Sequence, residues 1–251
     1  MKGFGYTCMA LVAAAFSGCS STSSENVTTQ GIHADIDVFA NGSGSTAVDV
    51  ELEVGGDGIT RTSLELGPGD TLTASANGIQ KTMTEDASVL GRFRYIASFD
   101  FDDAGTMFTV AFIRNNGTNA PNSNVTLPEG FIVQSPLNND IFSLADDIPI
   151  AWTPSGTSIV PSIQVSLSCP TTSGISFTDT ESVTLSSDTG VASLPVAAVI
   201  PIGTLDTTRL CEGEVHFSRW RRGNLDPNYG EGGDITAEHI ERAQFFVDLS
   251  I

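Results

Sequence analysis

The densest group of side chains suited to ligand binding is the run Arg219-Trp220-Arg221-Arg222. Trp offers a flat apolar face for stacking, and Arg offers paired donors that match carboxylates, phosphates and sugar hydroxyls. Tyr229 lies on the long polar loop that follows, and such loops often carry binding contacts. The pattern predicts a candidate ligand site at Arg219, Trp220, Arg221, Arg222 and Tyr229, for an anionic or sugar-like ligand. The alternative is that the arginines neutralise neighbouring carboxylates and Trp220 is half-buried.

A weaker candidate site, for a metal ion, consists of Asn224, Asp226 and Asn228. Oxygen ligands at alternate positions are typical of the beginning of a Ca²⁺ loop. The EF-hand pattern then requires Gly at the sixth position and Glu at the twelfth, where this chain has Tyr229 and Ile235. A polar turn with Asx-type hydrogen bonds is the simpler interpretation. The sequence therefore predicts no metal and no cofactor.

The sequence contains no catalytic motif that would define an enzyme. It has no Gly-x-Ser-x-Gly nucleophile elbow and no Gly-rich phosphate loop followed by Lys. The histidines at 33, 216 and 239 do not form a His-Glu-x-x-His pair. With 30 acidic residues, some carboxylates always resemble a glycosidase pair, so a polysaccharide-active enzyme is the least favoured function. A non-enzymatic protein is predicted.

The net charge narrows the range of partners. The chain of 251 residues has 30 Asp plus Glu against 11 Lys plus Arg, for a net charge of -19. Nucleic acids and anionic lipid headgroups carry the same sign, so both are repelled by the body of the protein. Nucleic-acid binding is therefore excluded from the predicted functions.

The first residues have the pattern of an export signal. Lys2 gives a short positive start, and residues 4–16 are mostly apolar. A membrane-spanning helix needs ~20 apolar residues, so this run is too short to remain in the bilayer. A short apolar run followed by small residues is typical of a signal peptide. We expect residues 1–18 to be removed from the mature protein.

The end of this signal resembles the lipobox of bacterial lipoproteins. The residues are Phe16-Ser17-Gly18-Cys19, with Phe16 where the family usually has Leu. The resemblance implies thioether attachment of diacylglycerol at Cys19, cleavage before Cys19, and acylation of the new N-terminus with a palmitate-type chain. In that family, Ser rather than Asp at position 20 implies an outer-membrane destination. Residues 19–30 then form a polar, flexible tether without apolar periodicity.

Four cysteines divide between the signal and the body. Cys8 is lost with the signal and Cys19 is assigned to the lipid, which leaves Cys169 and Cys211. The bacterial envelope outside the inner membrane is oxidising, so a single disulfide between them is predicted. The alternative is a pair of free buried thiols.

Alternating apolar and polar residues predict an all-β body. Apolar residues recur at every second position in 32–38 and 48–54, and Gly-rich turns separate these segments from the next ones. We predict one β-sandwich over residues 31–130 and a second over residues 131–251. The polar stretch 115–124 is expected to be a loop, and the only segment considered for a helix is 236–242.

The second half resembles the fibronectin type III and immunoglobulin-like families. The resemblance rests on the segment Asp146-Asp147-Ile148-Pro149-Ile150-Ala151-Trp152, a strand that ends in Trp before a polar turn. It implies two immunoglobulin-like β-sandwich domains, with Trp152 packed between the sheets. Such domains serve in binding, adhesion and spacing, so the resemblance implies no particular activity.

These predictions together describe a lipid-anchored protein of the bacterial outer membrane, on its periplasmic face or at the cell surface. The favoured function is a non-enzymatic binding or interaction module whose partner is an envelope protein or a glycan. The alternative is a structural or assembly lipoprotein that faces the periplasm. The lipid anchor is the only membrane contact that the sequence predicts.

Overall fold

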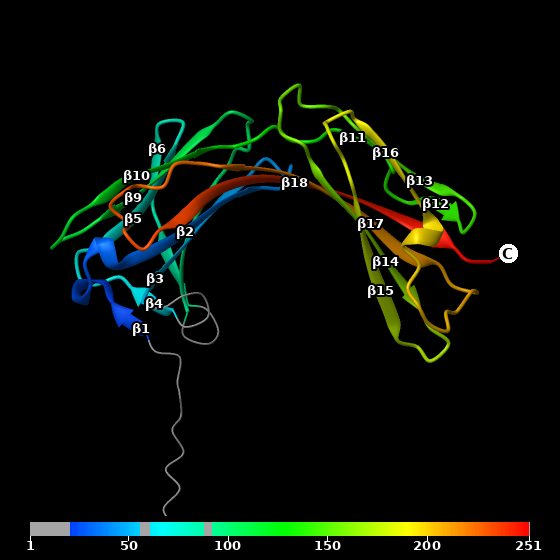
Figure 1. Cartoon of the computed structure of the whole chain (residues 1–251), viewed down its shortest axis with the longest axis horizontal. Helices are drawn as coiled ribbons and strands as arrows, with labels where there is room; N and C mark the ends of the chain where they lie inside the picture. The colour runs from blue at the N-terminus through cyan, green and yellow to red at the C-terminus, as the bar shows by residue number, and fades with distance from the viewer. Residues whose placement is uncertain (1–20, 56–60, 88–91, 251) are drawn as a thin grey trace, which may run out of the picture.

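The structure is a computed structural model that describes residues 21–55, 61–87 and 92–250. In these ranges the regular secondary structure is β-strand, with a few short 3-10 helices (Figure 1). The predicted all-β fold is confirmed. In chain order the elements are β1 (Ser21–Ser23), η1 (Ser24–Asn26), η2 (Thr29–Gly31), β2 (Ile32–Ala40), β3 (Thr46–Val54), β4 (Thr62–Glu65), β5 (Thr71–Ala76), β6 (Ile79–Thr82), β7 (Thr84–Ala87), β8 (Phe93–Phe99), β9 (Met107–Ile113), β10 (Ala120–Thr126), β11 (Val133–Ser135), β12 (Asp140–Ser143), β13 (Asp147–Trp152), β14 (Ser162–Pro170), β15 (Ser176–Val183), β16 (Val191–Pro195), η4 (Val196–Ala198), β17 (Cys211–Arg222) and β18 (Gly233–Asp248).

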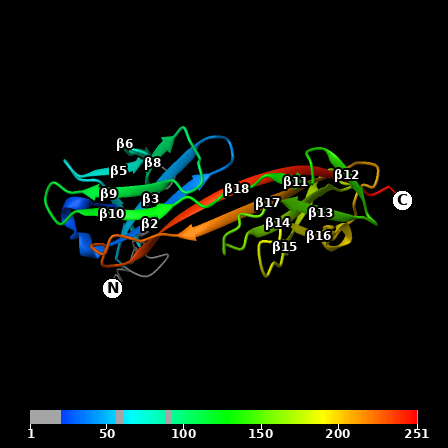
Figure 2. The same ribbon diagram turned by 90° about the horizontal axis from the view of Figure 1, so that it is seen from above.

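The strands form one large sheet and two small ones, and together they build an arch (Figure 1). The large sheet has 11 strands, with the path β1-β4-β3-β2-β18-β17-β14-β15. The small sheets are β10-β9-β5-β6 and β11-β13-β16, and they lie on the upper, outer side of the arch (Figure 1). Seen from above, β17 and β18 run through the middle of the molecule from one end towards the other (Figure 2).

The first buried cluster lies between the large sheet and the four-stranded sheet. In β2, Ile32, Ala34, Ile36 and Val38 are buried, while the residues between them face away from the core. Strands β5 and β9 supply the opposite side of the cluster, including Phe108 and Phe112. The two-residue alternation of apolar and polar side chains therefore determines which face of each strand packs in the core.

The second buried cluster lies between the other half of the large sheet and the three-stranded sheet. Trp152 of β13 is buried in it and contacts Phe217 edge-on, with ring centroids 6.1 Å apart. Trp152 is thus a core residue, as the sequence predicted.

The two clusters share the strand β18. β18 is 16 residues long, and it pairs in parallel with β2 through its first half and with β12 through its second half. Ile235 and Ala237 of β18 belong to the first cluster, while Phe245 and Val247 belong to the second. The division of the chain into two domains at residue 130 stays a prediction. In the structure, apolar residues between 225 and 237 pack with the first cluster.

The flexible tether predicted for residues 19–30 differs from the structure over residues 21–30. Here β1 pairs in parallel with β4, and the side chains of Ser24 and Thr29 are buried. The buried Arg114 donates hydrogen bonds to the carbonyl oxygens of Ser24 and Val27 and to the Thr29 hydroxyl. The segment is polar because these polar contacts, rather than apolar packing, fix it in place.

Two other local predictions were wrong. Residues 236–242 are not helical but lie within β18, because pairing with both β17 and β2 satisfies their backbone groups. Residues 120–124, expected to be a loop, belong to β10, which pairs with β9 across a register shift. That irregularity and several polar side chains hide the strand from a search for alternation.

Candidate functional site

The exposed face of the large sheet lies on the inner side of the arch, because its other face is covered by the two small sheets (Figure 1). We call it the concave face. The residues on it that matter here are Asp37 and Phe39 of β2, Trp220 and Arg222 of β17, and Asp234, Thr236 and Glu238 of β18.

Strand geometry separates the run 219–222 into two faces. Successive side chains of a strand point to opposite sides, so Trp220 and Arg222 lie on the concave face and Arg219 and Arg221 point the other way. Trp220 is 57% exposed, whereas Arg219 is completely buried. The structure therefore does not bring the predicted arginines together around the Trp ring.

Trp220 has an aromatic neighbour that the sequence analysis missed. Trp220 is the register partner of Glu238 on β18, and Glu238 is the partner of Phe39 on β2. Since adjacent strands are ~4.8 Å apart, the backbones of the two aromatic residues are ~10 Å apart, with Glu238 on the strand between them. Phe39 is also partly exposed. No local signal could reveal this pairing, because 181 positions separate Phe39 from Trp220 in the sequence.

Polar groups surround this pair of rings. Arg222 donates to Asp234 with an Nη2–Oδ2 distance of 2.6 Å, and Thr236 donates to Asp37 at 2.6 Å. The Ser218 hydroxyl donates to Glu238. Both donors and acceptors therefore lie on the same face of the sheet as the two aromatic residues.

Further along the same face is a polar hollow of about 390 Å³. The exposed residues around it are Ser166, Ser168, Glu212, Glu214, Gln244 and Phe246. Hydroxyl, carboxylate and amide groups beside an aromatic ring are suited to a ligand rich in hydroxyls.

The part of the concave face formed by β2 and β3 is strongly acidic. Asp35 and Asp37 of β2 are register partners of Glu51 and Asp49 of β3. Burial raises the pKa of Glu51, and the neighbouring carboxylates add to this effect, although the positive charge of Arg92 opposes it. An anionic ligand is repelled here, so the charge of this face favours a neutral or cationic ligand.

Arg219 forms its contacts inside the protein and not on the concave face. Its guanidinium donates to Gly130 O at 2.6 Å and to Asp188 Oδ2 at 2.9 Å, and it stacks over the Phe131 ring at 4.1 Å. Burial alone would raise the pKa of Asp188, but hydrogen bonds from Ser155 and Trp152, with the Arg219 charge, hold it below its usual value. This cluster ties the segment 129–131 to the sheet. Arg219 is therefore left out of the candidate site.

Tyr229 is also buried, and the structure places it in the first core cluster. Burial and the nearby Asp226 charge raise the pKa of its phenol, so the hydroxyl stays neutral. Tyr229 therefore cannot contact a ligand on the concave face.

The weak metal candidates form a hydrogen-bonded turn. Asp226 is buried, and its two carboxylate oxygens accept backbone N–H groups of Asn122 at 2.8 Å and Asn228 at 2.9 Å. The Asn228 amide donates to Asn119 O at 2.8 Å, and Asn224 forms a backbone bridge with Asn124. Across residues 21–55, 61–87 and 92–250, no group of three His, Cys, Asp or Glu side chains is placed to hold a metal ion.

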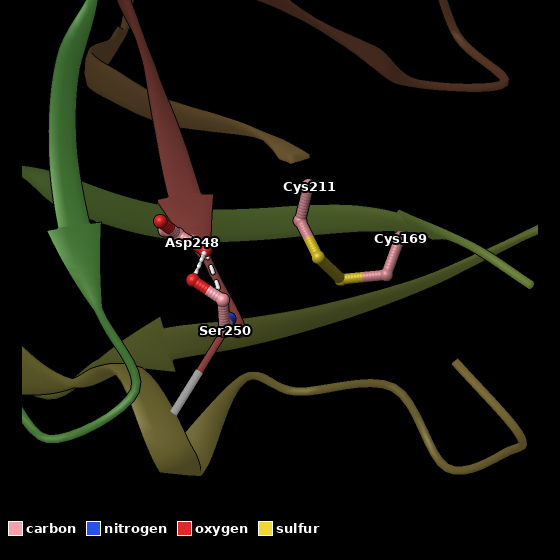
Figure 3. The surroundings of a disulfide bond; sticks show 4 residues. All are labelled: Cys169, Cys211, Asp248 and Ser250. Carbon is pink, nitrogen blue, oxygen red and sulfur yellow. Dashed lines mark hydrogen bonds between the residues drawn. A yellow bond between two sulfur atoms is a disulfide. The ribbon is translucent and has the colours of Figure 1, made fainter. Parts of the chain in front are cut away.

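The predicted disulfide is present. Cys169 at the end of β14 and Cys211 at the start of β17 are bonded, with Cα atoms 4.3 Å apart (Figure 3). Beside them, Ser250 donates from its backbone and its hydroxyl to the Asp248 carboxylate. Cys19 lies outside the described residues. In the part of the chain that the structure describes, no helix is long and apolar enough to span a bilayer.

No family model matches the chain, and no curated protein matches it in sequence. Among solved structures, it is similar to the adhesin InvE of Yersinia pseudotuberculosis, with 13% identity and a TM-score of 0.24. That match covers 88% of this chain and 59% of the adhesin, so the chain spans about three fifths of that protein.

Two further structures resemble the chain at a similar distance. The FN1-FN3 domains of chicken CNTN1 have 15% identity and a TM-score of 0.22, and the match covers 86% of this chain and 66% of that one. A Bacteroides ovatus protein, SGBP-B, solved with a mixed-linkage heptasaccharide, has 9% identity and a TM-score of 0.19, with 94% and 69% covered. These likenesses are too distant to assign a ligand or an activity.

Proposed function

We propose that the chain is a lipid-anchored, non-enzymatic protein of the bacterial outer membrane that binds a neutral glycan on its concave face. The observation that carries this proposal is the exposed pair Trp220 and Phe39, which flank Glu238 in one row across three strands. Sugar rings have apolar faces and hydroxyl edges, so they match aromatic side chains beside carboxylates and hydroxyls.

The charge of the surface favours one of the two ligand classes predicted from the sequence, the sugar-like ligand over the anionic one. Arg222 is engaged with Asp234, and Arg219 is buried in an ion pair. With these donors occupied and a net charge of -19, an anionic ligand is disfavoured. The sugar-like ligand is the one retained.

The binding test uses purified protein and a panel of neutral and anionic oligosaccharides, measured by calorimetry. The Trp220→Ala variant is expected to weaken binding of the neutral ligand at least tenfold, which corresponds to ~1.4 kcal/mol. Phe177→Ala is the matched control, because Phe177 is an exposed aromatic on β15, away from Trp220. If both variants bind as the parent does, the glycan site does not lie at Trp220.

The anchor is tested separately by fractionation. The Cys19→Ser variant is expected to leave the membrane fraction, while the parent chain stays in it after high-salt washing. Proteinase K treatment of intact cells then separates the two faces of the outer membrane, with a periplasmic protein as the leakage control. Cleavage of the body indicates a surface glycan, and protection indicates a periplasmic one.

The acidic part of the concave face favours a second candidate, the assembly lipoprotein with a basic protein partner. Here Asp35, Asp37, Asp49 and Glu51 lie in adjacent register positions. Such a surface accelerates encounter with a positively charged partner, and the effect falls with salt. An Asp37→Asn, Asp49→Asn double variant should then lose a cross-linked partner that the Trp220→Ala variant keeps.

A further inference from the structure

The second half of the chain contains two long segments without charge. Residues 148–178 and residues 189–205 contain no Asp, Glu, Lys or Arg, although the whole chain has 41 of these residues. The turn after β14 and residues 199–205 belong to these regions, and they are joined by the bridge between Thr171 and Leu205 at the same end of the large sheet.

Three exposed apolar side chains lie at that end, and we call them the apolar tip: Ile175, Phe177 and Ile202. They are 62%, 45% and 96% exposed. Thr172 N donates to Thr204 O, which joins the two segments, and a Cβ on Gly203 would lie 2.8 Å from the Phe177 ring. The Cys169–Cys211 disulfide fixes the bases of both segments (Figure 3). An exposed apolar cluster on a fixed base is typical of a contact surface.

The position of the N-terminus indicates what this surface contacts. β1 begins at Ser21, two residues after Cys19, and an extended chain of two residues reaches at most ~7 Å. β1 is paired with β4, and the Arg114 contacts hold the residues after it. An anchor at Cys19 therefore holds this leg of the arch against the bilayer without a tether.

The apolar tip lies on the same side of the molecule as β1. Figure 1 shows β1 at the lower end of one leg and the turn between β14 and β15 at the lower end of the other. The small sheets lie on the upper side. When the first leg rests on a bilayer, the second leg points towards the same bilayer.

We propose that the apolar tip is a second membrane contact, in which Ile175, Phe177 and Ile202 enter the lipid interface. This inference rests on the proposed anchor at Cys19. The anchor makes the second contact intramolecular, so even a weak one is occupied. The arch then contacts the membrane at both ends, through the anchor and the apolar tip, with its concave face turned towards the membrane.

The test uses the full lipoprotein in phosphatidylcholine vesicles whose acyl chains carry bromine, which quenches nearby Trp fluorescence. The Ile202→Trp variant is expected to show an added emission that bromine reduces at least twofold. Ile79→Trp is the matched control, because Ile79 is 47% exposed on β6, on the upper side of the arch. Its added emission should be unaffected.

Flotation of the same vesicles tests the lipid anchor separately from the tip contact. If both variants float and Ile202→Trp is not quenched, the tip contact is wrong and the anchor stands. If neither floats, the anchor fails and the inference fails with it. If the Ile202→Trp emission changes with protein concentration instead of with bromine, a second copy covers the tip. Adding Ile175→Asp to Ile202→Trp should reduce quenching and leave flotation unchanged.

Discussion

Arg219 is expected to be among the most costly side chains to remove. In an Arg219→Met variant, Asp188 keeps its burial and loses its counter-ion, and two carbonyl oxygens of the segment 129–130 lose their donor. Removing one partner of a buried ion pair costs about 3–5 kcal/mol. Total stability is typically 5–15 kcal/mol, so this is a large fraction. For a chain of this size, the expected fall in Tm is about 6–20 °C.

Urea unfolding followed by circular dichroism measures the change in the free energy of unfolding. Arg222→Met is the matched control, because its pair with Asp234 is exposed, and such pairs contribute about 0–1 kcal/mol. If Arg219→Met destabilises the protein no more than Arg222→Met does, the structural role assigned to Arg219 is wrong.

The same variant has a pH signature. The pKa of Asp188 is lower in the folded protein than the usual value of about 3.9 in an unfolded chain. The stability that this group contributes is therefore present above pH ~4 and is lost as the pH falls through the folded pKa. Without the Arg219 charge, the folded pKa rises towards the unfolded value, so the stability lost on acidification should be smaller in the variant than in the parent. Identical acid-unfolding curves for parent and variant would contradict this.

Three further predictions test other parts of the structure. Replacing Cys169 and Cys211 by Ser should cost ~4 kcal/mol, on a chain-entropy estimate for their separation of 42 residues, and urea unfolding with and without reductant measures this. Arg114→Met should release the segment 21–31, which proteinase K then trims while the rest of the chain resists; Arg94→Met, on the exposed face, should leave it protected. Burial is the main cause that raises the pKa of Tyr95 to about 12, so stability should be lost between pH ~10 and 12, and Tyr95→Phe should remove this component.

The sequence reveals the strands that bury one face and expose the other. β2 and β3 alternate strictly, so their buried residues follow from the pattern, but each strand extends two residues further into the turn between them than the pattern predicts. β15 is exposed along nearly its whole length, so it has no alternation to detect. The first half of β18 is fixed by partners on both sides, and the nearest part of β2 is almost 200 positions away.

Local sequence patterns reveal only part of the candidate site. Trp220 stands out by its type, and the structure leaves it exposed. Its separation from Arg219 follows from strand alternation, which could have been applied once residues 211–222 were assigned to a strand. Phe39 and Glu238 required the order of the strands in the sheet, which no local pattern contains.

The sharing of β18 between the two cores has a consequence for folding during synthesis. Ile235 and Ala237 are made long after Ile32, yet they complete the core to which Ile32 belongs. β2 has no neighbour on its β18 side until these residues arrive. The first half of the protein therefore has an open sheet edge until these residues are made, and such an edge is prone to pairing with other chains. A chaperone that covers exposed edges would have its greatest effect on this protein during that interval.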